Sequence, residues 1–333
     1  MNALKKILAT ILAILFIITA IAALIFFNFD RKAFTAETYQ QAFANADFYN
    51  KIPAIMADAM VSTTMNQENF PLVIRGMSTQ AWDTFFRTLL PQEVLKSMGD
   101  NALNSVFAYL NMQTNSAQLS LKSLKTSMVS DTGVQAVFTL LKTQPDCTLQ
   151  QISQMTIDLL SNSQILFCNP PQEMDSFLTP VIQGQMQMTT LAIPDQFTII
   201  RTPQNDPRPR LQNARRLMRL SPLLPLGLLL LMTLLAVNSL KSWLNWWGIP
   251  FVLTGSLASL MSLSGAPMTG AIFQQILVNR MPAFLPAILL DYTGNLASAM
   301  VQTLLDPVLF QGLALALIGF GMVAGAFFIK ANK

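Results

Sequence analysis

The chain has 333 residues, of which 52% are hydrophobic and only 11% are charged, and its formal net charge is +4. Two soluble domains would fit this length, but so apolar a composition is atypical of a soluble protein. The sequence contains no histidine, which excludes a Ser-His-Asp hydrolase and histidine-ligated zinc or haem.

An uncharged apolar run at residues 7–27 opens the chain. As a helix rising about 1.5 Å per residue, it would cover roughly 30 Å, the thickness of a hydrocarbon core. Lys5 and Lys6 precede this run, and Ala20 and Ala22 have the spacing of a signal-peptidase site. Because the apolar run continues well past that point, we expect residues 1–30 to be a retained transmembrane anchor rather than a cleaved signal peptide.

Residues 31–200 are typical of a helix-rich domain outside the bilayer. Thr35 and Ser78 are suited to cap helices, and Pro91 suits the first position of another. The expected helices are 36–46, 79–89, 91–110, 124–141, 149–161 and 170–184, and the expected strands are 117–121 and 197–200. A segment of about 170 residues is long enough to bury its own core.

The chain contains two cysteines, Cys147 and Cys168, and both lie in this central segment. An even pair in an external domain predicts one disulfide. Such a bridge would close a loop of about twenty residues and contribute about 3 kcal/mol by the loop-entropy estimate. Two buried free thiols are the alternative, since unpaired cysteine is commonly buried.

Residues 201–219 form a Pro- and Arg-rich segment that we interpret as a juxtamembrane linker, and its Pro-rich run at 202–209 is expected to be extended. It carries six arginines and one aspartate, whereas residues 33–200 carry seven basic and thirteen acidic residues. We expect its arginines to contact anionic lipid headgroups at the membrane surface, with pairing to the acidic domain as the alternative. The residues concerned are Arg208, Arg210, Arg215, Arg216 and Arg219.

Residues 220–333 are predicted to form a three-span membrane domain. Its spans, at 220–240, 247–263 and 308–329, contain no Asp, Glu, Lys or Arg. Indole rings prefer the headgroup level, so an interfacial collar is expected. Its members are Trp243, Trp246 and Trp247.

Between the last two spans, residues 265–306 are apolar but are interrupted by amides, Arg280 and Asp291. We expect an amphipathic loop that lies in the membrane interface or dips into lipid. Packing of this loop against the central domain is the alternative.

Small residues at helical spacing mark the fourth span. Gly312 with Ala316, and Gly321 with Gly325, would let another helix approach closely, and Ala258 with Ser262 offers a matching face on the third span. We interpret them as contacts within the bundle first and as a dimer seam second.

Orientation is expected to place the central domain outside the plasma membrane of a bacterium, with both termini in the cytoplasm. Lys5, Lys6, Lys241, Lys330 and Lys333 then lie inside, as the positive-inside rule requires. The arginines of 201–219 conflict with that rule. Long loops translocate largely regardless of charge, however, and the cysteine pair suits an oxidising compartment.

Several chemistries have no support in the sequence. It contains no Gly-x-x-x-x-Gly-Lys phosphate loop, and its partial dinucleotide motif, at Gly319, Gly321 and Ala324, falls inside an apolar span. The spans also lack the ionisable residues that carriers and pumps use. We therefore expect no cofactor, no metal site and no nucleic-acid partner.

Three short motifs, Pro145-Asp146-Cys147-Thr148, Cys168-Asn169-Pro170-Pro171 and Trp246-Trp247-Gly248-Ile249-Pro250, carry a resemblance. The chain resembles uncharacterised bacterial multi-pass membrane proteins that have one N-terminal anchor, a large extracytoplasmic helical domain and three closing spans. The resemblance implies a mainly α fold with four transmembrane helices, and it implies no substrate.

The leading hypothesis is a non-enzymatic integral membrane protein. Its external domain would bind a ligand, an envelope component or another membrane or envelope protein, and the lipid bilayer would be a further partner. One alternative is a membrane-anchored hydrolase with a histidine-free site, formed by the Ser/Lys pairs of residues 120–125 or by Glu173 and Asp175. The other alternative is a pore or a transporter accessory subunit.

Overall fold

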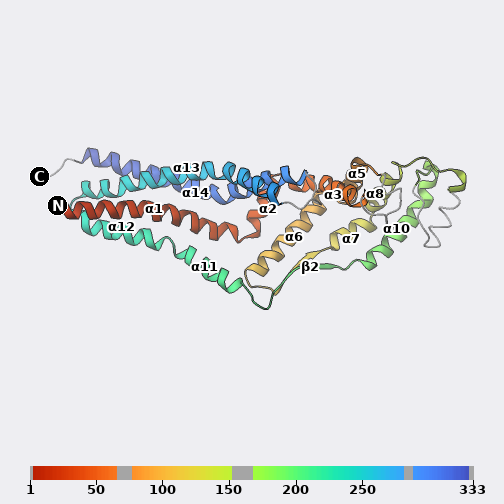
Figure 1. Cartoon of the computed structure of the whole chain (residues 1–333), viewed down its shortest axis with the longest axis horizontal. Helices are drawn as coiled ribbons and strands as arrows, with labels where there is room; N and C mark the ends of the chain where they lie inside the picture. Colours follow the sequence, from red (N-terminus) through yellow and green to blue (C-terminus); the bar gives the residue numbers. More distant parts are fainter. Residues whose placement is uncertain (1–2, 66–76, 152–167, 281–287, 330–333) are drawn as a thin grey trace.

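The computed structural model describes residues 3–65, 77–151, 168–280 and 288–329. The described chain is mainly helical and elongated, with long apolar helices near both termini at one end and the shorter helices of the central domain at the other (Figure 1). The expectation of a mainly α fold is confirmed.

Four helical segments are long and apolar enough to cross a membrane: Leu4–Ala33, Arg208–Ala236, Leu240–Thr269 and Gly294–Phe328. They lie in α1 (Ala3–Ala33), α11 with α12 (Arg208–Leu220 and Leu223–Ala236), α13 (Leu240–Arg280) and α14 (Ile288–Phe328). A helix satisfies every backbone group within one segment, which is what lipid requires. The four candidate spans therefore indicate a membrane protein.

Most of the juxtamembrane linker expected at 201–219 is helical. Residues 208–220 form α11, and a short turn at Ser221 and Pro222 separates it from α12. Pro209 lies in the first turn of α11, where a proline is tolerated, and the leucine, arginine and glutamine residues that follow are good helix formers. Only residues 202–207 remain as a connection.

The described residues of the segment expected to be an amphipathic loop, 265–306, form parts of two long helices. These are α13 and α14, each of 41 residues, and they pack against each other along their length. At about 1.5 Å per residue, each helix is roughly 60 Å long, twice the hydrocarbon thickness. The hairpin therefore extends well beyond one bilayer, and α14 contacts the central domain.

The central domain begins with α2 (Ala36–Asn45), directly after α1. Its other described elements are α3 (Phe48–Met65), α5 (Thr79–Leu89), α6 (Gln92–Leu110), β1 (Ser116–Ser120), α7 (Lys122–Val129), α8 (Asp131–Leu141), η1 (Gln172–Met174), α10 (Asp175–Ala192) and β2 (Gln196–Arg201). Ser78 caps α5 as expected, because its hydroxyl accepts a hydrogen bond from the amide of Ala81 at 3.2 Å. The helix expected at 149–161 lies largely outside the described residues.

The helix expected at 124–141 is two helices. Ser130 is extended, with ψ of 174°, and separates α7 from α8. Gly133 lies against the end of α7, where a Cβ atom would come within 2.0 Å of the carbonyl oxygen of Met128. Only glycine permits so close an approach, so the chain turns here.

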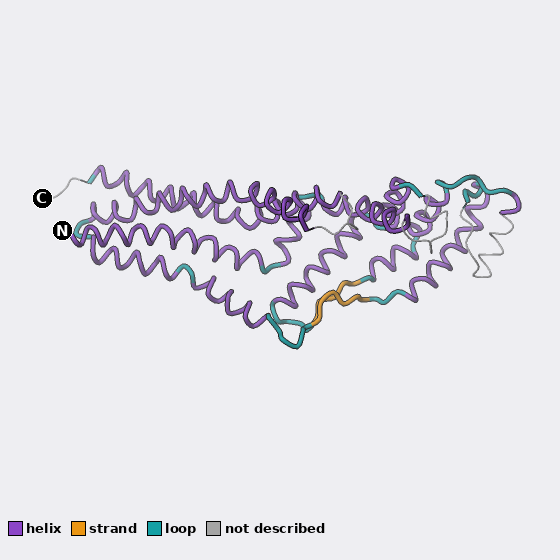
Figure 2. Tube along the Cα trace, in the orientation of Figure 1, coloured by secondary structure: helices purple, strands orange, loops and turns teal. Residues whose placement is uncertain are grey.

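Both expected strands are present, and they pair with each other. β1 and β2 are antiparallel, with Ser116 opposite Arg201 and Ser120 opposite Gln196, and an irregularity follows Ala117 (Figure 2). Since β2 directly precedes the connection to α11, the sheet brings the end of the domain back to the C-terminus of α6.

Buried apolar side chains form separate clusters in the two regions. One cluster of the central domain contains Val134, Phe138, Leu141, Cys168, Leu178 and Ile182. Another contains Tyr49, Leu89, Leu90, Leu95, Met128 and Ala136. A smaller cluster of Phe16, Ala20, Leu229 and Met232 joins α1 to α12.

Candidate functional site at the junction of the spans and the central domain

A buried ion cluster ties α11 to the end of α1. The Nε atom of Arg215 donates to Oδ1 of Asp30 at 2.9 Å, and that of Arg219 donates to Oδ2 at 2.6 Å. The Asp30 side chain is 2% exposed and that of Arg215 is 8% exposed, whereas that of Arg219 is 57% exposed. Arg215 also donates to Asn111 at 2.5 Å, so the cluster links the spans to α6.

A third arginine, Arg208, fixes the start of α11. The Nη1 atom of Arg208 donates to the carbonyl oxygens of Tyr109 at 3.1 Å and Thr114 at 2.7 Å, while its Nε donates to the carboxylate of Asp206. This bond with Arg208 holds the pKa of the Asp206 carboxyl below its ordinary value. Arg208 is buried and serves as an internal clamp.

A polar pair inside the bundle continues this region toward α14. Asn28 of α1 donates to the side-chain oxygen of Gln311 at 2.7 Å, and Asn28 is buried. A buried amide needs such a partner, because an unpaired one is costly in an apolar surrounding. α1, α6, α11 and α14 therefore meet within two turns of Asp30.

The five arginines expected at the membrane surface divide into two groups. Arg208, Arg215 and Arg219 bind carboxylates and carbonyls of the protein, whereas Arg210 and Arg216 are exposed. The acidic partner of Arg215 is Asp30 of α1 rather than a carboxylate of the acidic central domain. Lipid contact by Arg210 and Arg216 stays a prediction.

The three tryptophans lie together at the start of α13. The rings of Trp243 and Trp247 are 5.1 Å apart, and Trp247 donates through its indole nitrogen to Thr233 at 2.9 Å. Trp246 and Trp247 also pack against the α1 and α12 cluster. Two of the rings are thus partly used for helix packing, and their interfacial position stays a prediction.

Close helix packing occurs at a seam between α13 and α14. A Cβ atom on Gly255 would lie 2.4 Å from both the carbonyl oxygen of Gly312 and the amide nitrogen of Ala316, and one on Gly319 would lie 2.6 Å from Val252. Gly312 and Ala316 therefore belong to the seam, as expected. Among the described residues, a Cβ atom on Gly321 would meet no heavy atom within 4 Å and one on Gly325 only a leucine methyl at 3.9 Å, so that pair mediates no close packing within the described part of the chain.

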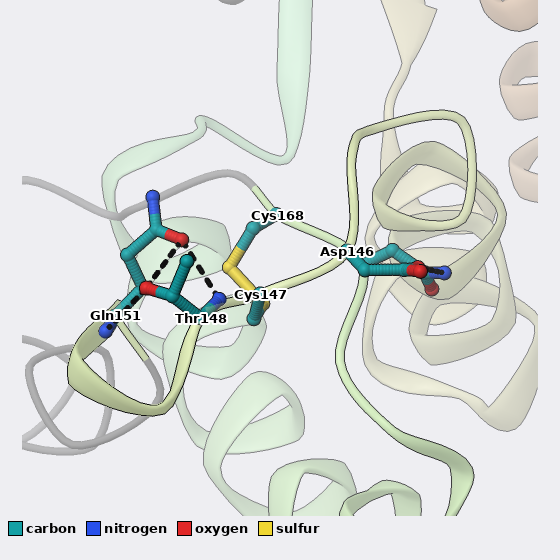
Figure 3. The surroundings of a disulfide bond; sticks show 6 residues. Asp146, Cys147, Thr148, Gln151 and Cys168 are labelled. Carbon is teal, nitrogen blue, oxygen red and sulfur yellow. Dashed lines mark hydrogen bonds between the residues drawn. A yellow bond between two sulfur atoms is a disulfide. The ribbon is translucent and has the colours of Figure 1, made fainter.

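Cys147 and Cys168 form a disulfide, with Cα atoms 5.0 Å apart (Figure 3). Beside it, Thr148 and Gln151 cap each other: Gln151 donates its amide to the Thr148 hydroxyl, and its side-chain oxygen accepts from the Thr148 amide. Asn169 donates to the carboxylate of Asp146 at 2.7 Å. Cys168 belongs to the buried cluster of α8 and α10, and Cys147 packs against that cluster. These contacts indicate a structural role for the bridge.

The residues considered for a histidine-free hydrolase are used differently. The Nζ atom of Lys125 donates to Asp195 at 2.5 Å and to the carbonyl of Ile193 at 3.1 Å. This contact joins α7 to the start of β2 and lowers the pKa of the Asp195 carboxyl. Glu173 and Asp175 lie in η1 and the first turn of α10.

Sequence reasoning missed four exposed apolar side chains on two consecutive elements, the end of α10 and β2. They are Met188, Leu191, Phe197 and Ile199, and we refer to them together as the α10/β2 surface. The alternation of Phe197 and Ile199 along a strand was the available signal, but it predicts only that one side of the strand is apolar.

Comparisons with protein families, with curated proteins and with solved structures find no match to this chain.

Proposed function

We propose that this chain is a non-enzymatic integral membrane protein whose central domain lies outside the cytoplasm of a bacterium and binds a partner protein of the cell envelope. The observation that carries the proposal is the α10/β2 surface. Leu191 is 80% exposed, Met188 69% and Phe197 59%. Scattered exposed apolar residues are ordinary, but several on adjoining elements are typical of interaction sites.

The sheet supports this choice of surface. β1 is covered on its other side, because it packs against α6 and the amide of Gln118 bonds to the Ser105 hydroxyl at 2.7 Å. β2 is the more exposed strand, and in the described part of the chain it pairs with β1 alone. An exposed strand edge beside apolar side chains is suited to a polypeptide that adds a strand.

Placement outside the cytoplasm is supported by the disulfide, since such bridges persist in oxidising compartments. The engagement of Lys125 with Asp195 favours a binding role over Ser/Lys catalysis. Both termini would then lie in the cytoplasm, because four spans return the chain to its starting side.

Site-specific photocrosslinking in native membranes tests the proposal. A photoreactive phenylalanine analogue at position 197 is expected to give one discrete protein adduct. The yield should fall about fivefold or more with Leu191→Ser, because that side chain would anchor the partner. Leu149→Ser makes the same chemical change at a position that is 87% exposed and should leave the yield unchanged. A smear of lipid adducts, or a yield insensitive to Leu191→Ser, would contradict a protein partner at this surface.

A further inference from the structure

A cavity of about 430 Å³ opens beside the ion cluster, between the end of α1 and α11. Its lining residues are Phe27, Asp30, Arg31, Thr35, Arg215 and Arg219. Three guanidinium groups and one carboxylate leave this lining with an excess of two positive charges. Both carboxylate oxygens of Asp30 already accept a bond from an arginine, so the cavity is suited to an anion.

Two of these guanidinium groups retain donors for a ligand. Arg219 donates to Asp30 through Nε, and its Nη atoms make no hydrogen bond within the described chain. Arg31 stacks over the Phe27 ring, with Cζ 4.5 Å from the centroid, and it likewise donates no hydrogen bond to described residues. Arginine binds phosphate through two parallel N–H groups, so this pair can hold one phosphate.

An apolar groove adjoins the cavity. It has a volume of about 270 Å³, lies between α1 and α12, and is lined by Ala20, Leu24 and Phe27 on one side and Pro222 and Leu226 on the other. Phe27 lines both spaces, so the cavity and the groove lie next to each other. A basic pocket next to an apolar groove matches a molecule with an anionic head and a hydrocarbon chain.

We propose that the cavity and the groove together form a binding site for one anionic phospholipid. Its phosphate lies between Arg31 and Arg219, and one acyl chain lies along α1 and α12. A free anion would use the cavity alone and leave the groove without a role. The positively charged group of a zwitterionic headgroup would be repelled by Arg31, Arg215 and Arg219, so the site prefers a headgroup with net negative charge. The site is separate from the α10/β2 surface and does not depend on it.

Native mass spectrometry of the delipidated full-length protein in detergent tests this site. Phosphatidylglycerol and phosphatidylcholine with identical acyl chains are titrated separately. The wild-type protein is expected to bind one phosphatidylglycerol roughly tenfold or more tightly than phosphatidylcholine, as two surface cations would provide. Arg31→Gln with Arg219→Gln should abolish this preference. Arg87→Gln with Arg201→Gln removes the same charge from exposed positions of the central domain, outside the cavity, and should preserve it.

The groove has its own variant pair. Leu226→Trp fills the groove and should weaken both lipids several-fold, whereas Leu224→Trp, at an exposed position that does not line the groove, should not. Should the double arginine variant lose its monodisperse state, Arg31→Gln alone serves, since that side chain makes no described hydrogen bond. A preference that survives Arg31→Gln overturns the head site. Two results together would reject the phospholipid site: lipid binding that Leu226→Trp does not weaken, and displacement of the lipid by inorganic phosphate. The cavity would then be a site for free phosphate.

Discussion

Asp30 and Arg215 are 185 residues apart in the chain, yet their side chains meet in a buried pair at 2.9 Å. Asp30 lies three residues before the end of α1, and Arg215 is central in α11. Because Arg215 also bonds to Asn111, which caps the C-terminus of α6, this one side chain joins the first span, the juxtamembrane helix and the central domain. The Asp30 carboxylate is therefore one of the groups that hold the three in their relative position, together with the contacts of Arg208.

Replacing that carboxylate should destabilise the junction. Asp30→Asn leaves Arg215 buried without its counter-ion, and removal of one partner from a buried pair typically costs about 3 kcal/mol or more. We expect a clear fall in the midpoint of thermal unfolding of the detergent-solubilised protein. Tryptophan fluorescence measures this midpoint.

The matched control for Asp30→Asn is Glu93→Gln, which neutralises an exposed carboxylate in the first turn of α6. That change should shift the midpoint little. Equal midpoints for Asp30→Asn and Glu93→Gln would show that the pair contributes nothing to the junction.

The junction was only partly predictable. The arginines of 201–219 stand out by charge, and their clustering next to a span favours a lipid surface. Their pairing with Asp30 depends on α11 folding back along α1, which is a long-range packing outcome that no local pattern encodes. Asp30 itself follows an apolar run and resembles any polar residue at the end of a span.

The glycine seam predicts a contrast between two positions. Gly255→Ala places a methyl group 2.4 Å from backbone atoms of α14, so the helices must separate, at a cost of about 1–3 kcal/mol. Gly321→Ala makes the same substitution where nothing lies within 4 Å, and helix propensity makes it neutral or slightly stabilising.

Denaturation midpoints of the two glycine variants in the same detergent measure this difference. Equal midpoints would mean that α13 and α14 do not approach closely at Gly255.

The four apolar runs were sufficient to predict the spans, and alternating or capped segments were sufficient for the strands and for α5. The hairpin was not predictable in the same way. Arg280, Asp291 and the amides of 265–306 interrupt the apolar run, and such interruptions normally end a span. Asp291 and the amides nevertheless lie within α13 and α14, because a helix can continue beyond the bilayer when a neighbouring helix packs against it.

Acid should weaken the contact between α7 and β2. Lys125 lowers the pKa of the Asp195 carboxyl from its ordinary 3.8, so the folded state binds that proton less readily than the unfolded chain. The stabilisation is complete above about pH 3.8 and is lost as the pH falls through the lowered value.

Asp195→Asn should remove this acid-side dependence while leaving the profile above pH 5 parallel to that of the wild type. Helix content followed by circular dichroism from pH 6 to pH 2 measures it. A wild-type profile that coincides with that of Asp195→Asn throughout would contradict the linkage.

Loss of the disulfide should destabilise the central domain rather than the spans. Cys147→Ser with Cys168→Ser removes a 21-residue cross-link, a loss of about 3 kcal/mol by loop entropy. Limited proteolysis should then cut the central domain faster, while the fragments that contain α13 and α14 stay protected. Unchanged cleavage rates would show that the buried cluster around Cys168 holds this region without the bridge.

The same cysteines report the side of the membrane on which the domain lies. A membrane-impermeant maleimide added to intact cells should label the wild-type protein only after a reductant opens the bridge, because the thiols are otherwise paired. Lys241→Cys in a background without the native cysteines provides the opposite case, since residue 241 is expected inside and should react only after permeabilisation. Labelling of the wild type that requires permeabilisation would place the central domain in the cytoplasm. A disulfide would then have to persist in a reducing compartment, which it rarely does, and the positive-inside preference of the arginines in 201–219 would decide the topology instead.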